Sequence, residues 1–152
     1  MKPLILLDID GVISPLGQVY NPILIQHPYG TWAIPEHIIL WLFKNYENYE
    51  IVWASTWEEE SNFINRDLGI KDFNFIEFTE NNSIWFKFDS IKNFVSGQKN
   101  RTIILIDDET PTKTSDWCSN NLINCIKPNS IEGLTVNDLK TINKIIKEWD
   151  IP

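Results

Sequence analysis

Two runs of large aliphatic residues, each ended by an aspartate, constrain this chain more than any other feature. The runs are Leu4–Leu7, followed by Asp8, and Ile103–Ile106, followed by Asp107. Unbroken apolar runs of this length are typical of strands that are buried on both faces of a parallel sheet. They are far too short to cross a bilayer, which takes about 20 residues. The chain is therefore predicted to be an α/β protein whose chemistry lies where its strands end.

Short apolar strands and amphipathic helices alternate along the chain, as in a sheet with helices on both faces. Strands are predicted at residues 3–9, 51–54, 73–78, 102–106 and 122–126, and helices from Pro35, from Glu58, over 85–95 and over 136–149. Thr56 is the candidate N-cap of the helix that opens at Glu58. Prolines and glycines interrupt residues 10–33. They predict a long irregular segment, with 13–33 as a flap-like insertion over the site.

Length and charge limit the class of protein. The 152 residues suit one domain, predicted to span 1–152, with 21 acidic and 13 basic residues and a net charge of −8. Strong non-specific binding to nucleic acid or to an anionic membrane is not expected, because both need a positive field. The two cysteines, Cys118 and Cys125, do not make a secreted disulfide framework. A cytoplasmic protein with reduced thiols is expected.

Acidic residues follow both aliphatic strands. Asp8 and Asp10 are two positions apart, so their side chains point the same way in extended chain, and Gly11 allows a sharp turn after them. Asp107 and Asp108 follow the later strand. If the two strands are neighbours, at least three carboxylates converge. Hard oxygen ligands in a partly open site suit Mg²⁺, so the sequence predicts a magnesium site there.

Other side chains near the strand ends suit a phosphate ligand. Ser55 and Thr56 follow a strand, where a hydroxyl beside helix N-terminal amides can hold a phosphoryl oxygen or cap the helix. Lys87, taken alone, is read as a solvated lysine. Some aromatic side chains are predicted chiefly to pack, with stacking on a nucleobase as the alternative; these are Trp57, Trp32, Tyr29 and Tyr20.

Taken in order, these segments resemble the four motifs of the haloacid dehalogenase (HAD) superfamily. The first motif matches residues 4–12, the second 51–55 and the fourth 103–108. The third, a lysine that opens a helix, is best matched by Lys87, with Lys92 as the alternative. A closer likeness is to the small HAD domains related to the Swiss Army Knife RNA repair proteins, carried by residues 7–12, 52–58, 106–109 and 133–135. The resemblance implies a three-layer Rossmann-like domain with a mostly parallel five-stranded sheet and essentially no cap domain.

The resemblance also implies an activity. It implies a phosphatase in which Asp8 is the nucleophile and Asp10 the general acid and base, with Ser55 and Lys87 binding phosphoryl oxygens. Dehalogenases lack an acid at the position of Asp10, which favours phosphate-ester hydrolysis. The implied ligands of Mg²⁺ are Asp8, the backbone carbonyl of Asp10, and Asp107 or Asp108.

The implied substrate is a phosphomonoester, on a small molecule such as a nucleotide or on a nucleic-acid end. Two alternatives stay open at this point. One is a non-catalytic HAD-like module that binds phosphate or a partner, and the other is a phosphotransferase.

Overall fold

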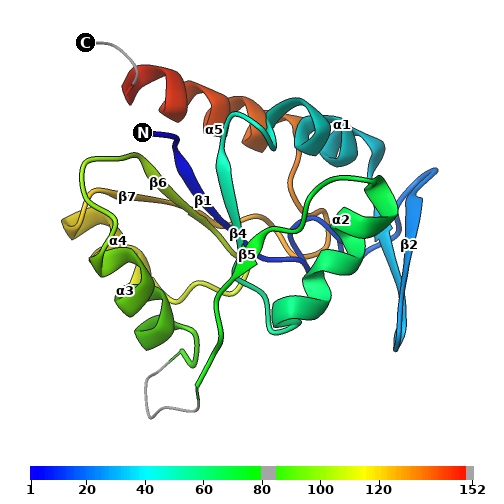
Figure 1. Ribbon diagram of the computed structural model, residues 1–152, viewed down its shortest axis with the longest axis horizontal. Helices are drawn as coiled ribbons and strands as arrows, with labels where there is room; N and C mark the ends of the chain where they lie inside the picture. The colour runs from blue at the N-terminus through cyan, green and yellow to red at the C-terminus, as the bar shows by residue number, and fades with distance from the viewer. Residues whose placement is uncertain (80–84, 150–152) are drawn as a thin grey trace.

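A central parallel sheet organises the molecule (Figure 1). The computed structural model describes residues 1–79 and 85–149, and over these residues the sheet has five strands. In sheet order they are β5 (Asn74–Phe75), β4 (Glu50–Trp53), β1 (Leu4–Leu7), β6 (Ile103–Ile106) and β7 (Ile123–Ile126). Leu7 pairs with Trp53 on one side and with Ile106 on the other, all in parallel register. The strands β4, β1 and β6 therefore end level with one another.

Helices cover both faces of this sheet, which confirms the three-layer prediction. The described helices are α1 (Glu36–Asn45), the 3₁₀ helix η1 (Glu58–Asn62), α2 (Phe63–Leu68), α3 (Phe88–Ser96), α4 (Thr112–Asn120) and α5 (Val136–Trp149). Ile5 and Leu7 pack in one core with residues of α1, α2 and α5. Leu4 and Leu6 pack in a second core with residues of α3 and α4. Both faces of β1 are covered, and this is why its sequence is aliphatic without a break.

A β-hairpin corrects the prediction that residues 10–33 are irregular. The strands β2 (Ile23–His27) and β3 (Gly30–Ile34) pair antiparallel, and His27 pairs with Gly30 across the turn. Ile25, Trp32 and Ile34 are buried and fix the hairpin to the core. The hairpin has one exposed face, so its apolar signal is weak, and three prolines stand directly beside its strands. The extent of the single domain, 1–152, and the role of 13–33 as a flap stay predictions.

One helix was not predicted, and two smaller predictions differ from the structure. The helix α4 was missed because its buried positions are Thr114 and Cys118, which give little apolar periodicity. The strand expected at 73–78 is only the two residues of β5. Thr56 is exposed and is not a cap: η1 begins after Trp57, and no side chain caps it. The bounds predicted for the last helix, 136–149, are those of α5.

Candidate active site

The carboxyl ends of three neighbouring strands form the floor of the site. β1 lies between β4 and β6. Backbone hydrogen bonds continue past the strand ends: Ala54 N–H donates to Leu7 O at 2.8 Å, and Asp8 N–H donates to Ile106 O at 3.1 Å. The residues that follow these strands are therefore held at one edge of the sheet, where parallel α/β folds place their ligands.

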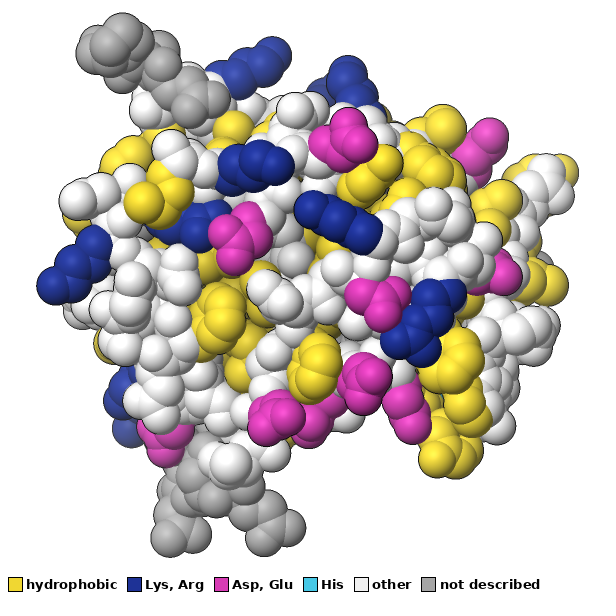
Figure 2. All heavy atoms as spheres, viewed as in Figure 1, with side chains coloured by type: hydrophobic (Ala, Val, Ile, Leu, Met, Phe, Trp, Pro, Cys, Tyr) yellow, Lys and Arg dark blue, Asp and Glu magenta, His cyan; other side chains and the backbone are white. Residues whose placement is uncertain are grey.

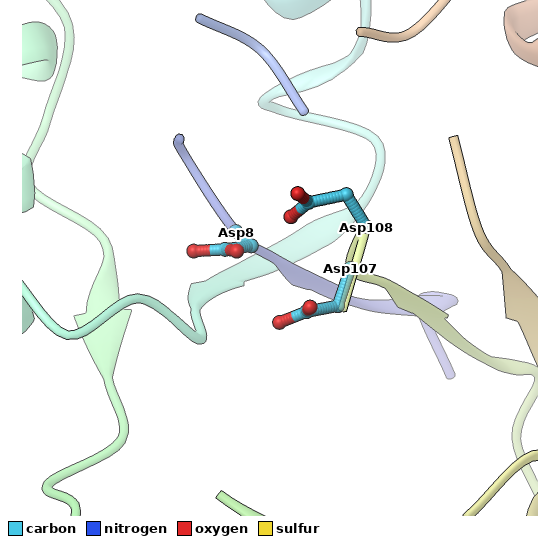
Figure 3. Close-up of side chains that lie close together, drawn as sticks. All are labelled: Asp8, Asp107 and Asp108. Carbon is cyan, nitrogen blue, oxygen red and sulfur yellow. The ribbon is translucent and has the colours of Figure 1, made fainter. Parts of the chain in front are cut away.

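Asp8, Asp107 and Asp108 bring their carboxylates together at this edge (Figure 3). One oxygen from each lies within 4.8 Å of the other two. Asp8 is 7% exposed and Asp107 is fully buried. Backbone N–H groups fix both carboxylates, since Ile9 donates to Asp8 Oδ1 at 2.8 Å and Glu109 to Asp107 Oδ1 at 2.9 Å. The sequence predicted that carboxylates from two strands far apart in the chain would meet, and the structure brings them together.

Gly11 lies against this cluster in a conformation that favours glycine. Its φ of +75° is in the left-handed region, and a Cβ at this position would lie 2.3 Å from Asp108 Oδ2. A side chain here would strain the backbone and displace the carboxylate. The sharp turn that the sequence predicts after Asp10 therefore also makes room for Asp108.

Lys87 supplies a positive charge to the site. Its Nζ donates to Asp107 Oδ2 at 2.7 Å and to Ala54 O at 2.8 Å, and lies 3.3 Å from Asp8 Oδ1. Its side chain is only 4% exposed. Lys87 thus links the end of β4 to both acidic strand ends, and almost no water screens its charge.

The structure separates two pairs of candidates that the sequence left open. Lys87 lies in the cluster, whereas the side chain of Lys92 is 41% exposed on α3. Ser55 is buried and its Oγ accepts the Trp57 N–H at 3.3 Å, whereas Thr56 is exposed. The geometry therefore favours Lys87 over Lys92 and Ser55 over Thr56 as candidates for the phosphate site. Their action on a phosphoryl group stays a prediction.

Asp10 occupies a different position from the other acidic residues. Its side chain is exposed and does not belong to the cluster of three carboxylates. Its Oδ2 accepts a hydrogen bond from Trp57 Nε1 at 2.7 Å. Sequence reasoning missed this contact, although Trp57 follows Ser55 by two positions at a strand end. The predicted contribution of the Asp10 backbone carbonyl to a metal site stays a prediction.

Burial and charge shift the pKa values of the site. Burial raises the pKa of Asp8 from 3.8 to about 8, with Lys87 opposing the shift and Asp107 adding to it. Burial alone would lower the pKa of Lys87, but the charges of Asp8 and Asp107 outweigh it and raise that pKa. Burial and the Asp107 charge raise the pKa of Asp108. When all three carboxylates are ionised, the one ammonium leaves two negative charges, which a divalent cation would balance.

Acidic side chains also cluster on the face of the molecule that Figure 2 shows. Acidic side chains gather over the region of η1 and α2 (Figure 2), and Glu58, Glu59 and Glu60 make the first turn of η1. Basic side chains are dispersed over the same face. Attraction of a phosphate by the site therefore depends on local charges and not on a broad positive field.

A three-layer parallel α/β domain with an aspartate, a hydroxyl and an aspartate pair after its strands, and a lysine just before a helix, is typical of the HAD-like class. The family model for the HAD domain in Swiss Army Knife RNA repair proteins matches residues 4–139, and the chain belongs to this family. The predicted resemblance is confirmed, and the family suggests phosphohydrolase-type chemistry. No curated protein and no solved structure matches the chain. Within residues 1–79 and 85–149, no helix is long and apolar enough to span a membrane.

Proposed function

We propose that this protein is a Mg²⁺-dependent phosphatase that hydrolyses a phosphomonoester through an aspartyl-phosphate at Asp8. One observation carries the proposal. Asp8 and Asp107 are buried at the ends of neighbouring strands, the half-buried Asp108 joins them, and the buried Lys87 contacts Asp8 and Asp107. A purely structural ion pair needs one carboxylate for one lysine, so the surplus of acid is better explained by a bound cation.

The donor set fits Mg²⁺. The residues that would hold the ion are Asp8, Asp107 and Asp108, all hard oxygen donors, with the Asp10 backbone carbonyl as a further ligand. When bound, Mg²⁺ would neutralise charge on the phosphate and favour ionised Asp8, whose pKa is otherwise about 8. The nucleophile is therefore expected to be ready at neutral pH only in the presence of a divalent cation.

The first half of the reaction uses Asp8 and Asp10. A carboxylate oxygen of Asp8 attacks phosphorus, and the bond from phosphorus to the ester oxygen breaks. Asp10 gives its proton to the departing oxygen, so the alcohol leaves neutral. Lys87 lies 3.3 Å from Asp8 Oδ1 and offsets negative charge at the reacting centre.

The second half of the reaction releases inorganic phosphate. Water attacks the phosphorus of the aspartyl-phosphate while Asp10 takes its proton, and the bond between phosphorus and Asp8 breaks. Ser55 would hold a phosphoryl oxygen in both halves. Its Oγ already accepts the Trp57 N–H, so the hydroxyl proton is the part that it can offer to a ligand.

Two observations guide the choice of substrate. Between β1 and α1, where all residues are described, the only regular structure is the hairpin β2–β3, and such a small insertion leaves room for a large phosphorylated partner. The matched family is named for a domain that occurs in RNA repair proteins. A phosphorylated nucleotide or nucleic-acid end is therefore the first substrate class to test.

The test is hydrolysis of p-nitrophenyl phosphate and of 3′- and 5′-phosphorylated oligonucleotides, with Mg²⁺ and with EDTA. We expect turnover only with Mg²⁺, and a loss of about 1,000-fold or more in Asp8→Asn, since the nucleophile is gone. Asp116→Asn is the matched control, because Asp116 is an exposed aspartate on α4. Equal turnover by the wild type and Asp8→Asn would remove Asp8 from the mechanism. Mg²⁺-dependent binding without hydrolysis of any ester would point instead to a binding module.

A further inference from the structure

The hydrogen bond between Trp57 and Asp10 joins the edge of the site to a cluster of aromatic rings. Trp57 Nε1 donates to Asp10 Oδ2 at 2.7 Å, a short distance for an N–H donor. Asp10 is exposed and Trp57 is half-buried, so the bond forms where a ligand can reach the carboxylate. An exposed carboxylate without such a partner would sample several rotamers.

The backbone holds Trp57 in a tight turn. Glu58 N–H donates to Ser55 O at 2.9 Å, and Trp57 N–H donates to Ser55 Oγ at 3.3 Å. Glu58 then takes a left-handed φ of +49°, which is unusual for a residue with a side chain. The chain thus leaves β4 along a defined path, and the indole is carried back toward the loop after β1.

Rings from the hairpin hold the indole from the other side. The Trp57 ring centre lies 4.7 Å from that of His27, 5.3 Å from that of Trp32 and 6.0 Å from that of Tyr29. Trp32 is 2% exposed and is fixed in the core, whereas Tyr29 is 75% exposed at the hairpin turn. These edge-on and stacked contacts are in the range of favourable aromatic pairs. The hairpin therefore restricts the orientation of Trp57.

The geometry points to Trp57 as the positioning residue of Asp10, held in place by the hairpin rings of His27, Tyr29 and Trp32. This inference rests on the proposed function, in which Asp10 exchanges a proton with the ester oxygen and with water. The indole N–H engages Oδ2, so the proton that Asp10 transfers is carried by Oδ1. Trp57 thus selects one oxygen for proton transfer and holds it in one orientation.

The test compares wild type with Trp57→Phe on esters that differ in their need for an acid. p-Nitrophenyl phosphate releases a stabilised phenolate, whereas an alkyl phosphate releases a basic alkoxide and depends on protonation. We expect kcat/KM of Trp57→Phe to fall at least about ten-fold further on the alkyl ester, with KM changed less than about two-fold. Phenylalanine keeps an aromatic ring, so lost packing alone would weaken both reactions equally.

A matched control removes an indole hydrogen bond elsewhere. Trp41 Nε1 donates to Asn143 Oδ1 at 3.3 Å between α1 and α5, so Trp41→Phe should leave the ratio of the two kcat/KM values unchanged. Tyr29→Ala is a second variant, at an exposed position where folding is not at risk. It should shift the ratio in the same direction as Trp57→Phe, by a smaller factor.

A double-mutant cycle with Asp10→Asn shows whether Trp57 acts through Asp10. In the Asp10→Asn background, Trp57→Phe should not lower kcat/KM on the alkyl ester further than on p-nitrophenyl phosphate, because residue 10 then has no acidic proton to transfer. An additive loss, or equal losses on both esters, would assign Trp57 to packing and overturn the inference while leaving the proposed function intact. Absence of turnover by the wild type on both esters would overturn the two together.

Discussion

Lys87 Nζ lies 2.7 Å from Asp107 Oδ2 in a pair whose side chains are 4% and 1% exposed. The same ammonium lies 3.3 Å from Asp8, so one lysine serves two buried acids. Removing one member of a buried ion pair leaves the remaining charge without compensation, which is more costly than losing a surface pair.

Lys87→Met is accordingly expected to lower the free energy of unfolding by about 3 kcal/mol in EDTA, or roughly 10 °C in Tm. The measurement is thermal unfolding followed by circular dichroism. Lys92→Met is the control: this exposed lysine pairs only at the surface, so its loss should change stability by less than about 0.5 kcal/mol. Equal stability of the two variants would contradict the buried ion pair.

The raised pKa of Asp8 predicts a pH dependence of stability when no divalent cation is present. Folded Asp8 keeps its proton up to about pH 8, whereas in the unfolded chain it loses the proton near 3.8. Between these values the unfolded state binds fewer protons, so the contribution of Asp8 to stability falls as pH rises. It is fully present below about pH 4 and lost above about pH 8.

Urea unfolding of the wild type and Asp8→Asn in EDTA checks this prediction. Asn cannot ionise, so the variant should become the more stable protein at pH 8, by at least about 2 kcal/mol, and the gap should shrink toward pH 4. Millimolar Mg²⁺ should narrow the gap at pH 8, since the ion stabilises the ionised form. If the free energies of unfolding of the two proteins in EDTA change in parallel from pH 4 to pH 8, the pKa of Asp8 is not raised.

Gly11→Ala tests the close approach of the loop after β1 to Asp108. Alanine in the left-handed conformation, with a φ of +75°, should lower the free energy of unfolding by about 1–2 kcal/mol. The added Cβ would lie 2.3 Å from Asp108 Oδ2 and would displace that carboxylate. Both Tm and the affinity for Mg²⁺ measured by calorimetry should therefore fall. Gly97→Ala is the control, because its φ is −86° and nothing lies within 4 Å of a Cβ there. Unchanged Mg²⁺ affinity in Gly11→Ala would argue against Asp108 as a ligand.

Cys125 is expected to be reactive at a pH where ordinary thiols are not. A hydrogen bond with Cys118 lowers the pKa of Cys125 to about 6, and Cys125 lines a cavity of about 470 Å³ beside α4 and β7. Alkylation by iodoacetamide should reach half its maximal rate near pH 6, against about 8.5 for the urea-unfolded chain. Cys118→Ala should raise the pH at which alkylation of the folded protein reaches half its maximal rate. A native midpoint near 8.5 would refute the prediction.

The sequence was most informative where local pattern and topology agree. An aliphatic run buried on both faces is readable in Leu4–Leu7 and in Ile103–Ile106, and the aspartates that follow them then had to share one edge of the sheet. The three-layer fold and the acidic cluster could both be predicted on that basis. The helix α5 was equally readable, because its buried residues recur at helical spacing.

Other features depend on contacts that no local pattern encodes. Ser55 and Thr56 are chemically alike, and only the turn at the end of β4 buries one and exposes the other. The hairpin was hidden because its outer face is exposed, and α4 because it buries Thr114 and Cys118 in place of an apolar stripe. The bond from Trp57 to Asp10 joins residues 47 positions apart and becomes visible only in the folded chain.

The hydrogen bonds that complete the centre of the sheet are the same ones that locate its acidic edge. Asp8 N–H donates to Ile106 O, and Ala54 N–H donates to Leu7 O, so the pairing of the strands continues as far as Asp8 and the residue before Ser55. The same backbone hydrogen bonds that pair the central strands therefore also hold the proposed catalytic groups in place. Separation of β1 from β4 or β6 is therefore expected to pull the proposed site apart together with the sheet.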